Sequence, residues 1–301
     1  MNKTATVATV SRKSRLGRAT VGDWVIVALM IVLIAACLLP VLNVVAVSFS
    51  EQDAIMRREV AFVPIGFQTD AYRDVLNTDR FIRSMGWTAA LTAIAVVVNL
   101  FMTTLCAYPL TYDSLVGRKV ITFFIIFTML FNAGLIPAFI LFRDLGLLNS
   151  PLVLILPGMI SVFNMIIMRN FFMGIPDSLK ESAEIDGAGP MTTLIKIYLP
   201  LSVPVMATLG LFYAVGRWNG FMDALFFLPG AAEWHPIQLL LFNIINNVSA
   251  IDAMDPGATG PGWSMAVQNA AIVIAMVPIL CVYPFIQQYF VKGATLGAVK
   301  G

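Results

Sequence analysis

Charged residues are scarce in this chain. Asp, Glu, Lys and Arg together make up 12% of its 301 residues, which is about half the share in an ordinary soluble domain. Hydrophobic residues make up 59% and the mean hydropathy is +0.85, the composition of an integral membrane protein. The net charge of +2 is too small to indicate a nucleic-acid partner, and the basic residues form no patch interleaved with aromatics.

Motifs of catalysis are also missing. The chain contains no Gly-Lys dipeptide, and therefore no phosphate-binding loop. It contains no GxSxG or HExxH motif either. Its single histidine, His235, has no second His or Cys beside it, so we expect a solvated loop residue and no metal site. We therefore expect that the chain is not an enzyme and has no cofactor of its own.

Cysteine is rare, and the three cysteines lie in apolar runs without CxxC spacing: Cys37, Cys106 and Cys281. This pattern indicates small buried side chains and gives no sign of a disulfide or a metal site.

Six apolar segments are long enough to cross a bilayer, which requires about 20 helical residues. The first, 24–47, is too long for the ~7–15-residue core of a cleavable signal and is expected to be retained. The others are 85–110, 120–142, 152–173, 201–229 and 265–290. We predict an all-α, polytopic fold with a six-span domain over 24–292, a basic tail over 1–23 and a short tail over 293–301.

The distribution of Lys and Arg predicts the orientation of these spans. With both termini in the cytoplasm, twelve Lys and Arg residues fall in cytoplasmic segments and six in outside segments, as positively charged loops favour. Segment 174–200 is then cytoplasmic and segment 230–264 lies outside. The exception is the first outside loop, which holds five arginines: Arg57, Arg58, Arg73, Arg80 and Arg83.

Segment 174–200 is the one long polar insertion between apolar spans. Ser178 and Glu181 have the spacing of a capping box, which predicts a helix starting near Leu179. Gly187 is suited to end that helix in the left-handed conformation. Pro190 fits the first turn of a second, amphipathic helix that should end before Pro200. The segment is thus predicted to form two short helices joined at a glycine, which we call the knuckle.

The knuckle resembles the EAA loop of the permease subunits of binding-protein-dependent ABC importers. The matching residues are Glu181, Ser182, Ala183, Asp186, Gly187, Ala188 and Pro190, with Ser182 in place of the first alanine. Similar motifs recur elsewhere: GLIP at 134–137, LGLLNS at 145–150, ISVFNMIIMRNFF at 160–172 and RWNGFMDAL at 217–225. Together they resemble the sugar-uptake branch that includes the smaller maltose permease subunit, and more narrowly a subgroup for complex oligosaccharides and polysaccharide fragments.

The resemblance implies the type I ABC importer permease fold in a bacterial inner membrane, with the knuckle as the coupling helix. It implies a homologous second permease, two ATPase subunits that bind ATP and Mg²⁺, an external solute-binding protein and an oligosaccharide substrate. Arg217 and the subgroup together suggest an acidic oligosaccharide, such as a uronate. The alternatives are an ion-coupled carrier, which would need buried acids in several spans where only Asp223 qualifies, and a membrane scaffold without flux.

Polar residues inside the spans are candidates for the translocation path: Asn132, Asn164, Trp218, Asn219 and Asp223. On a continuous helix Asn219 and Asp223 would share one face, and Trp218 is a candidate to stack on a sugar ring. The alternatives are helix–helix hydrogen bonds for the asparagines, and an interface belt with salt bridges for Arg217, Trp218 and Asp223. The family more commonly has Pro-Leu at 223–224.

The outside segment 230–264 ends in a Gly/Pro-rich run that predicts an irregular loop. In similar permeases this loop faces the external binding protein. Its candidate contact residues here are Trp234, His235, Pro256 and Gly257.

Overall fold

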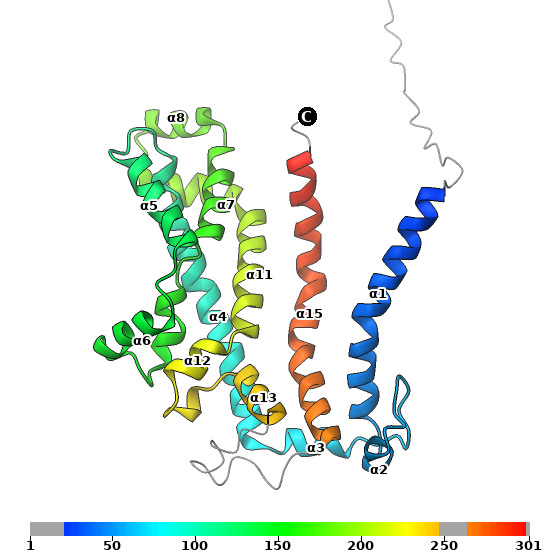
Figure 1. Cartoon of the computed structure of the whole chain (residues 1–301). Coiled ribbons are helices and arrows are strands. Elements are labelled where there is room, and N and C mark those ends of the chain that lie inside the picture. Colours follow the sequence, from blue (N-terminus) through cyan, green and yellow to red (C-terminus); the bar gives the residue numbers. More distant parts are fainter. Residues whose placement is uncertain (1–20, 247–263, 299–301) are drawn as a thin grey trace, which may run out of the picture.

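The computed structural model describes residues 21–246 and 264–298, and within them every regular element is a helix. Four helices are long: α1 (Val21–Ser48), α4 (Asp79–Ala107), α11 (Val203–Asn219) and α15 (Met265–Ala298). They pack in the order α4, α11, α15, α1 (Figure 1). The predicted all-α fold is confirmed.

Three of these helices are each long and apolar enough to cross a bilayer: α1, α15, and α4 with its short extension η1 (Pro109–Thr111). Three more candidate spans are bent pairs of helices. The first pair is α5 (Arg118–Leu130) with α6 (Leu135–Asp144), bent by 113°. The second is η2 (Pro151–Leu154) and η3 (Leu156–Gly158) with α7 (Val162–Met173), bent by 45°. The third is Pro190–Leu201 with α11, bent by 81°. The described residues thus hold three straight candidate spans, or six if each bent pair is one span.

The predicted span 120–142 is not one straight helix, because residues 131–134 interrupt it. Phe131 is extended, with ψ of 109°, and Gly134 has φ of +89°. Glycine adopts this left-handed region at little cost, so the chain can turn sharply between α5 and α6.

The predicted span 201–229 is also interrupted. α11 ends at Asn219, Gly220 is extended (φ −76°, ψ 127°), and α12 (Met222–Phe227) is a separate helix. A Cβ at position 220 would lie 3.1 Å from the carbonyl oxygen of Gly216, so a glycine lets the chain leave the helix at this point.

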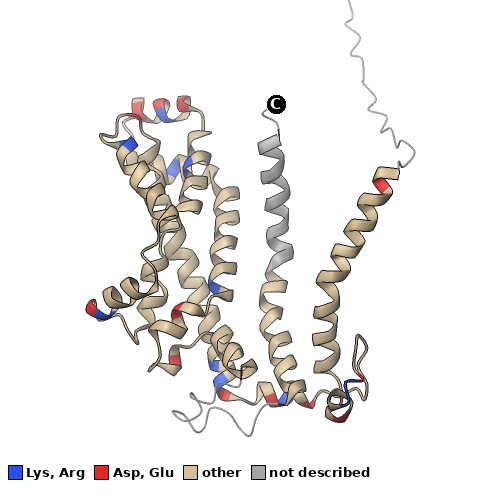
Figure 2. Cartoon of the chain, viewed as in Figure 1, with Lys and Arg blue, Asp and Glu red and all other residues tan. Residues whose placement is uncertain are grey.

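The molecule has two distinct ends (Figure 1). One, the knuckle end, holds α8 (Asp177–Ile185), the start of α1 and the end of α15. The other, the loop end, holds α2 (Gln52–Met56), α3 (Asp70–Leu76) and α13 (Ile237–Ile245). Charged residues gather toward these two ends and are sparse along the long helices between them (Figure 2). Both ends of the described chain therefore lie on the side of the knuckle, as the predicted topology requires.

The loop end contains more helix than the sequence predicted. Within the expected irregular loop 230–264, a 3-10 turn, η5 (Ala232–Trp234), leads into α13, which packs on α4 and α15. The buried residues of α13 lie around much of the helix: Ile237, Leu239, Leu240, Leu241 and Ile244. Its sequence therefore lacks the polar face by which an amphipathic helix is recognised.

Three apolar clusters hold the bundle together. At the knuckle end, the C-terminal part of α4 packs with α7 and the start of α11 around Met165, Phe172 and Leu209. At the loop end, one cluster joins α3, α4, α13 and α15, and another joins α4, η2, α12 and α13. α4 takes part in all three clusters and thus connects the two ends.

The first helix packs on α15, but only its C-terminal end is buried. Only Ala46, Val47 and Ser48 are buried in α1.

Two of the three cysteines, Cys37 on α1 and Cys281 on α15, are exposed, and Cys106 is half-buried. The expectation of buried cysteines is therefore wrong for two of the three. An apolar side chain in a membrane can face lipid, so its sequence context does not imply burial in protein.

Candidate functional site

The knuckle begins with a sharp turn at a proline. Pro176 precedes α8 with φ of −58° and ψ of 130°, and the helix starts at Asp177. The predicted capping box is wrong: Ser178 lies inside the first turn, and its carbonyl accepts a hydrogen bond from the Ser182 hydroxyl at 2.8 Å. Pro176 determines the start because its ring fixes φ, and the Asp177 carboxylate lies where the helix dipole favours negative charge.

Gly187 ends α8 as predicted. Its φ is +80°, its N–H donates to the Glu184 carbonyl at 3.1 Å, and the Ala188 N–H donates to the Ala183 carbonyl at 2.9 Å. This pair of bonds is the Schellman motif, which requires a left-handed residue. A Cβ at Gly187 would meet no atom within 4 Å, so the glycine is needed for its backbone conformation alone.

The second half of the knuckle restarts at Pro190, also as predicted. α9 (Pro190–Thr193) has Pro190 in its first turn and continues into a π-helical turn, η4 (Leu194–Tyr198), and then α10 (Leu199–Leu201). The predicted stop before Pro200 is wrong. Pro200 has no N–H to donate. The wider π-helical turn before it shifts the hydrogen-bond pattern, so the helix continues past the proline. The chain bends only at Ser202, where α11 begins.

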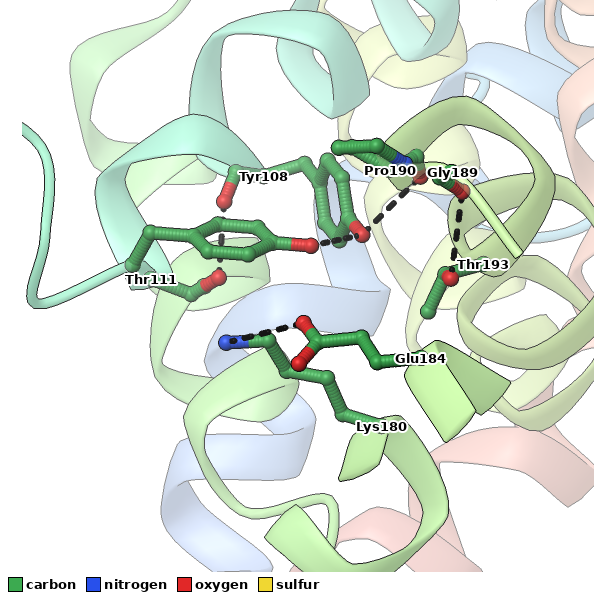
Figure 3. A network of polar contacts seen from close by, with 8 residues as sticks. Tyr108, Thr111, Lys180, Glu184, Gly189, Pro190 and Thr193 are labelled. Carbon is green, nitrogen blue, oxygen red and sulfur yellow. Dashed lines mark hydrogen bonds and ion pairs between the residues drawn. The ribbon is translucent and has the colours of Figure 1, made fainter. Parts of the chain in front are cut away.

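The knuckle rests on two tyrosines at the end of α4 (Figure 3). The Tyr108 hydroxyl donates to the Pro190 carbonyl at 3.0 Å and lies 2.5 Å from the Tyr112 hydroxyl. Since Tyr108 has one proton, Tyr112 donates to it. Lys180 of α8 lies 3.8 Å from the centroid of the Tyr112 ring and 3.9 Å from Glu184. The first half of the knuckle therefore contacts Tyr112, the second half contacts Tyr108, and the two tyrosines are hydrogen-bonded to each other.

Most of the predicted coupling residues face away from the bundle. Ala183 is buried and Ala188 is half-buried, whereas five are exposed: Glu181, Ser182, Asp186, Gly187 and Pro190. Ile185, which the sequence reasoning did not select, is 86% exposed. An isolated apolar residue beside acidic ones on this surface is a signal that could have identified it.

A polar cavity of about 270 Å³ lies farther along the bundle, between α4, α7 and α11. Arg217 lies 14 residues after the first residue of α11, roughly 21 Å from the knuckle end of that helix. The lining residues are Asn99, Gly158, Ser161, Asn164, Phe212, Tyr213, Gly216, Arg217, Gly220 and Asp223. The cavity therefore brings together residues from three separate predicted spans.

Hydrogen bonds fix part of the cavity wall. The Tyr213 hydroxyl accepts from the Ser161 N–H at 3.1 Å and lies 2.6 Å from the Thr103 hydroxyl. Asn164 is buried one turn into α7, and its N–H donates to the Ser161 hydroxyl at 3.4 Å. These contacts hold the start of α7 against α4 and α11.

The charged residues of the cavity are loosely paired. Arg217 Nη1 lies 3.5 Å from Asp223 Oδ2, and the side chains are 13% and 56% exposed. The Oδ1 atom of Asn99 is buried and has no hydrogen-bond partner. The cavity thus offers both a positive group and an unsatisfied acceptor.

Two of the five predicted path residues line the cavity, Asn164 and Asp223. Trp218 is buried and its Nε1 donates to the Ala275 carbonyl of α15 at 3.2 Å, so the expectation of a sugar-stacking ring is wrong. Asn219 is exposed and does not line the cavity; the break at Gly220 separates it from Asp223. Asn132 is exposed in the α5–α6 linker, where it accepts from the Gly134 N–H at 2.8 Å.

The segment that leads into α13 at the loop end is fixed to α4 through its aromatic residues. Trp87 Nε1 donates to the Trp234 carbonyl at 2.8 Å, and the two rings meet edge to face at 4.8 Å. His235 is 4% exposed, so the expectation of a solvated histidine is wrong. Packing against α4 buries it, a long-range effect that its sequence neighbours do not reveal. Pro256 and Gly257 lie outside the described residues.

The His235 ring is held in one neutral form. Nε2 lies 2.8 Å from the Leu228 carbonyl, so Nε2 carries the proton, and Nδ1 is buried without a partner. Burial lowers the pKa of His235. Among the described residues, no three His, Cys, Asp or Glu side chains are grouped to bind a metal ion.

Residues 99–295 match the family model described as the binding-protein-dependent transport system inner membrane component. The chain belongs to this family. The predicted family and transport function are thereby confirmed, and such inner-membrane permeases are not themselves catalytic. The six-span count and the coupling helix stay predictions.

Known permeases resemble this one over nearly its whole length. It is 42% identical over 281 residues to the polygalacturonan/rhamnogalacturonan transport system permease protein YtcP of Bacillus subtilis, covering 93% of this chain and 98% of YtcP. It is 42% identical over 269 residues to Protein LplC of the same species, covering 89% and 90%. A solved bacterial ABC transporter involved in the import of the acidic polysaccharide alginate matches with a TM-score of 0.80 at 32% identity, covering 94% of this chain and 100% of that one.

Proposed function

We propose that this permease forms half of the translocation path of an ATP-driven importer for acidic oligosaccharides. Two similar proteins are named for transport of acidic polysaccharides, polygalacturonan/rhamnogalacturonan and alginate. The observation that carries the proposal is the Arg217 guanidinium, 13% exposed in a cavity between the long helices. A positive charge inside a span is costly and suits a pathway for a negatively charged solute.

The complete importer in this proposal has four further subunits. A homologous permease supplies the other half of the path, two ATPase subunits bind ATP and Mg²⁺ below the knuckle, and a solute-binding protein delivers the oligosaccharide outside. The permease lies in the inner membrane with both termini and the knuckle in the cytoplasm. The family description supports the membrane and the binding protein, and the positive-charge distribution supports the orientation.

In the proposed mechanism the knuckle transmits motion of the ATPases to the cavity. Closure of the ATPases around ATP displaces α8, and Tyr108 and Tyr112 transmit this displacement to the end of α4. The α9–α10 arm transmits it to α11 through the bend at Ser202. α4 contributes Asn99 to the cavity and α11 contributes Arg217, so two of the helices that line the cavity are connected to the knuckle. Their movement opens the path alternately to each side.

The proposal is tested by reconstituting the complete transporter in proteoliposomes. We expect uptake of a uronate oligosaccharide that requires both ATP and the loaded binding protein, and weak uptake of a neutral oligosaccharide of equal length. Uptake driven by an ion gradient without ATP would establish a secondary carrier, and no uptake under any of these conditions would favour a scaffold. Equal uptake of neutral chains would contradict the acidic substrate.

A further inference from the structure

We propose that the cavity between α4, α7 and α11 is a saccharide subsite of this subunit. In it, Asn99 binds a sugar hydroxyl, and Arg217 exchanges its partner Asp223 for the carboxylate of a uronate residue. The inference rests on the proposed function and adds the residues that select the substrate.

Asn99 provides the first observation. Asn99 lines the cavity and is 5% exposed, and its amide oxygen is buried without any hydrogen-bond partner. An unpaired acceptor inside a protein lowers stability, and an apolar side chain at this position of α4 would avoid that cost. A hydroxyl group that enters the cavity can donate to this oxygen. Saccharides carry such hydroxyls on every ring.

Arg217 provides the second observation. A guanidinium has five N–H donors, yet the only ion-pair partner of Arg217 in the described chain is Asp223, through one contact at 3.5 Å. Its Nη2 lies beside Gly158, where an added Cβ would be 3.2 Å away. The glycine thus leaves room next to the guanidinium. Two donors remain available for the bidentate contact that arginine makes with carboxylates.

Asp223 is well placed to leave Arg217 when a ligand arrives. Its side chain is 56% exposed, so release into water costs little. While the cavity is empty, Asp223 balances a positive charge that would otherwise be isolated among the helices. When a uronate binds, its carboxylate takes over that function, and return of Asp223 then promotes release. Such an exchange keeps binding weak enough for transport.

The size of the cavity limits what it can bind. Its volume of about 270 Å³ is below the roughly 300–1,000 Å³ of pockets that enclose whole ligands. It therefore suits one sugar residue of a longer chain, with the remainder in the space beyond Asp223.

The test uses the complete reconstituted transporter and measures uptake kinetics of a uronate trisaccharide and a neutral trisaccharide. We expect Asn99→Leu to reduce uptake of both by about tenfold or more, and Arg217→Gln to reduce the preference for the uronate by a similar factor. We expect Asp223→Asn to lower both KM and the maximal rate for the uronate, because Arg217 then lacks its competing partner. The loaded binding protein should still stimulate ATP hydrolysis in all three variants.

A matched control is Thr104→Val. Thr104 lies on α4 like Asn99, and its hydroxyl is likewise buried without a partner, but it does not line the cavity. This variant should transport both saccharides normally. A further variant exchanges the charges, Arg217→Asp with Asp223→Arg. If the pair is only structural, the variant with exchanged charges should take up the uronate as the wild type does. If Arg217 binds the substrate, this variant should keep the thermal stability of the wild type but take up no uronate.

The outcomes separate this inference from the proposed function. If the wild-type transporter takes up no uronate with ATP and binding protein, the proposed function fails. Thermal unfolding first shows that the Asn99 and Arg217 variants are folded. If the wild type transports uronates and these variants keep the wild-type KM and selectivity, only the subsite is overturned.

Discussion

At the scale of single residues, glycine and proline determine the shape of the knuckle. Gly187 has the left-handed φ of +80° that a Schellman motif requires, and Pro190 occupies the first turn of α9. Both were predictable because local backbone chemistry fixes them.

Gly187→Val should uncouple the transporter. A β-branched residue in the left-handed region costs about 1–2 kcal/mol, so the ends of α8 and α9 should change their relative direction, while the spans insert normally. We expect loss of both uptake and binding-protein-stimulated ATP hydrolysis. The control is Gly189→Ala, because Gly189 is extended (φ −73°) and has no atom within 4 Å of an added Cβ. Normal uptake by the Val variant would contradict the coupling function.

His235 should make the stability of the loop end depend on pH. Burial lowers its pKa in the folded protein, while the unfolded chain has a pKa of about 6.5. Below about 6.5 the unfolded state therefore binds more protons, and stability falls as the pH falls through that value until the folded pKa is reached. Thermal unfolding at about pH 8 and pH 5.5 should show this loss. His235→Gln, which does not titrate, should reduce it, and an unchanged pH dependence would count against the buried neutral ring.

The burial of His235 could not be predicted from its neighbours in sequence. It depends on α4, whose Trp87 contacts Trp234 more than a hundred residues away in the chain.

At the scale of elements, the tyrosine pair under the knuckle connects two helices with one small network. Tyr108 and Tyr112 were absent from the sequence reasoning, since nothing in their local pattern shows that Pro190 and Lys180 would meet them. The bends had the same limitation, because the π turn before Pro200 and the break at Gly220 depend on packing. α13 was missed because it is apolar on most sides.

Tyr108→Phe should weaken coupling without removing it. The variant loses the bond to the Pro190 carbonyl, worth about 0.5–1.5 kcal/mol, while its ring still packs against Tyr198 and Phe172. We expect fewer saccharides transported per ATP hydrolysed and faster hydrogen exchange in residues 177–198. Tyr72→Phe removes a comparable hydroxyl contact, to Ser48, at the loop end. It should leave both measurements unchanged, and equal effects of the two variants would argue against a special contribution from Tyr108.

At the scale of the whole molecule, both described chain ends and the knuckle lie on one side of the bundle. The sequence predicted this arrangement from an even number of spans, and it predicted the family from motifs spread over most of the chain. It could not select the path residues, because which polar side chains share a cavity depends on four helices packing together.

Cysteine labelling should place the knuckle in the cytoplasm. In a variant without Cys37, Cys106 and Cys281, a cysteine at the exposed position Ser182 should resist a membrane-impermeant thiol reagent in intact cells and react in inverted vesicles. Asn77→Cys, exposed at the loop end, should show the opposite pattern. Labelling of Ser182→Cys in intact cells would show that the knuckle lies outside, and the proposed coupling to a cytoplasmic ATPase would then fail.

The sparse burial of α1 has a mechanical consequence. A helix of 28 residues is about 42 Å long, and only its last residues are enclosed by the rest of the chain. Val47 is the one residue of α1 in the three apolar clusters, so a tilt of about 10° around that point would move the far tip by roughly 7 Å and leave the other residues of the clusters in place. The permease can therefore change its outline in the lipid at its first helix while the bundle that contains the cavity keeps its packing.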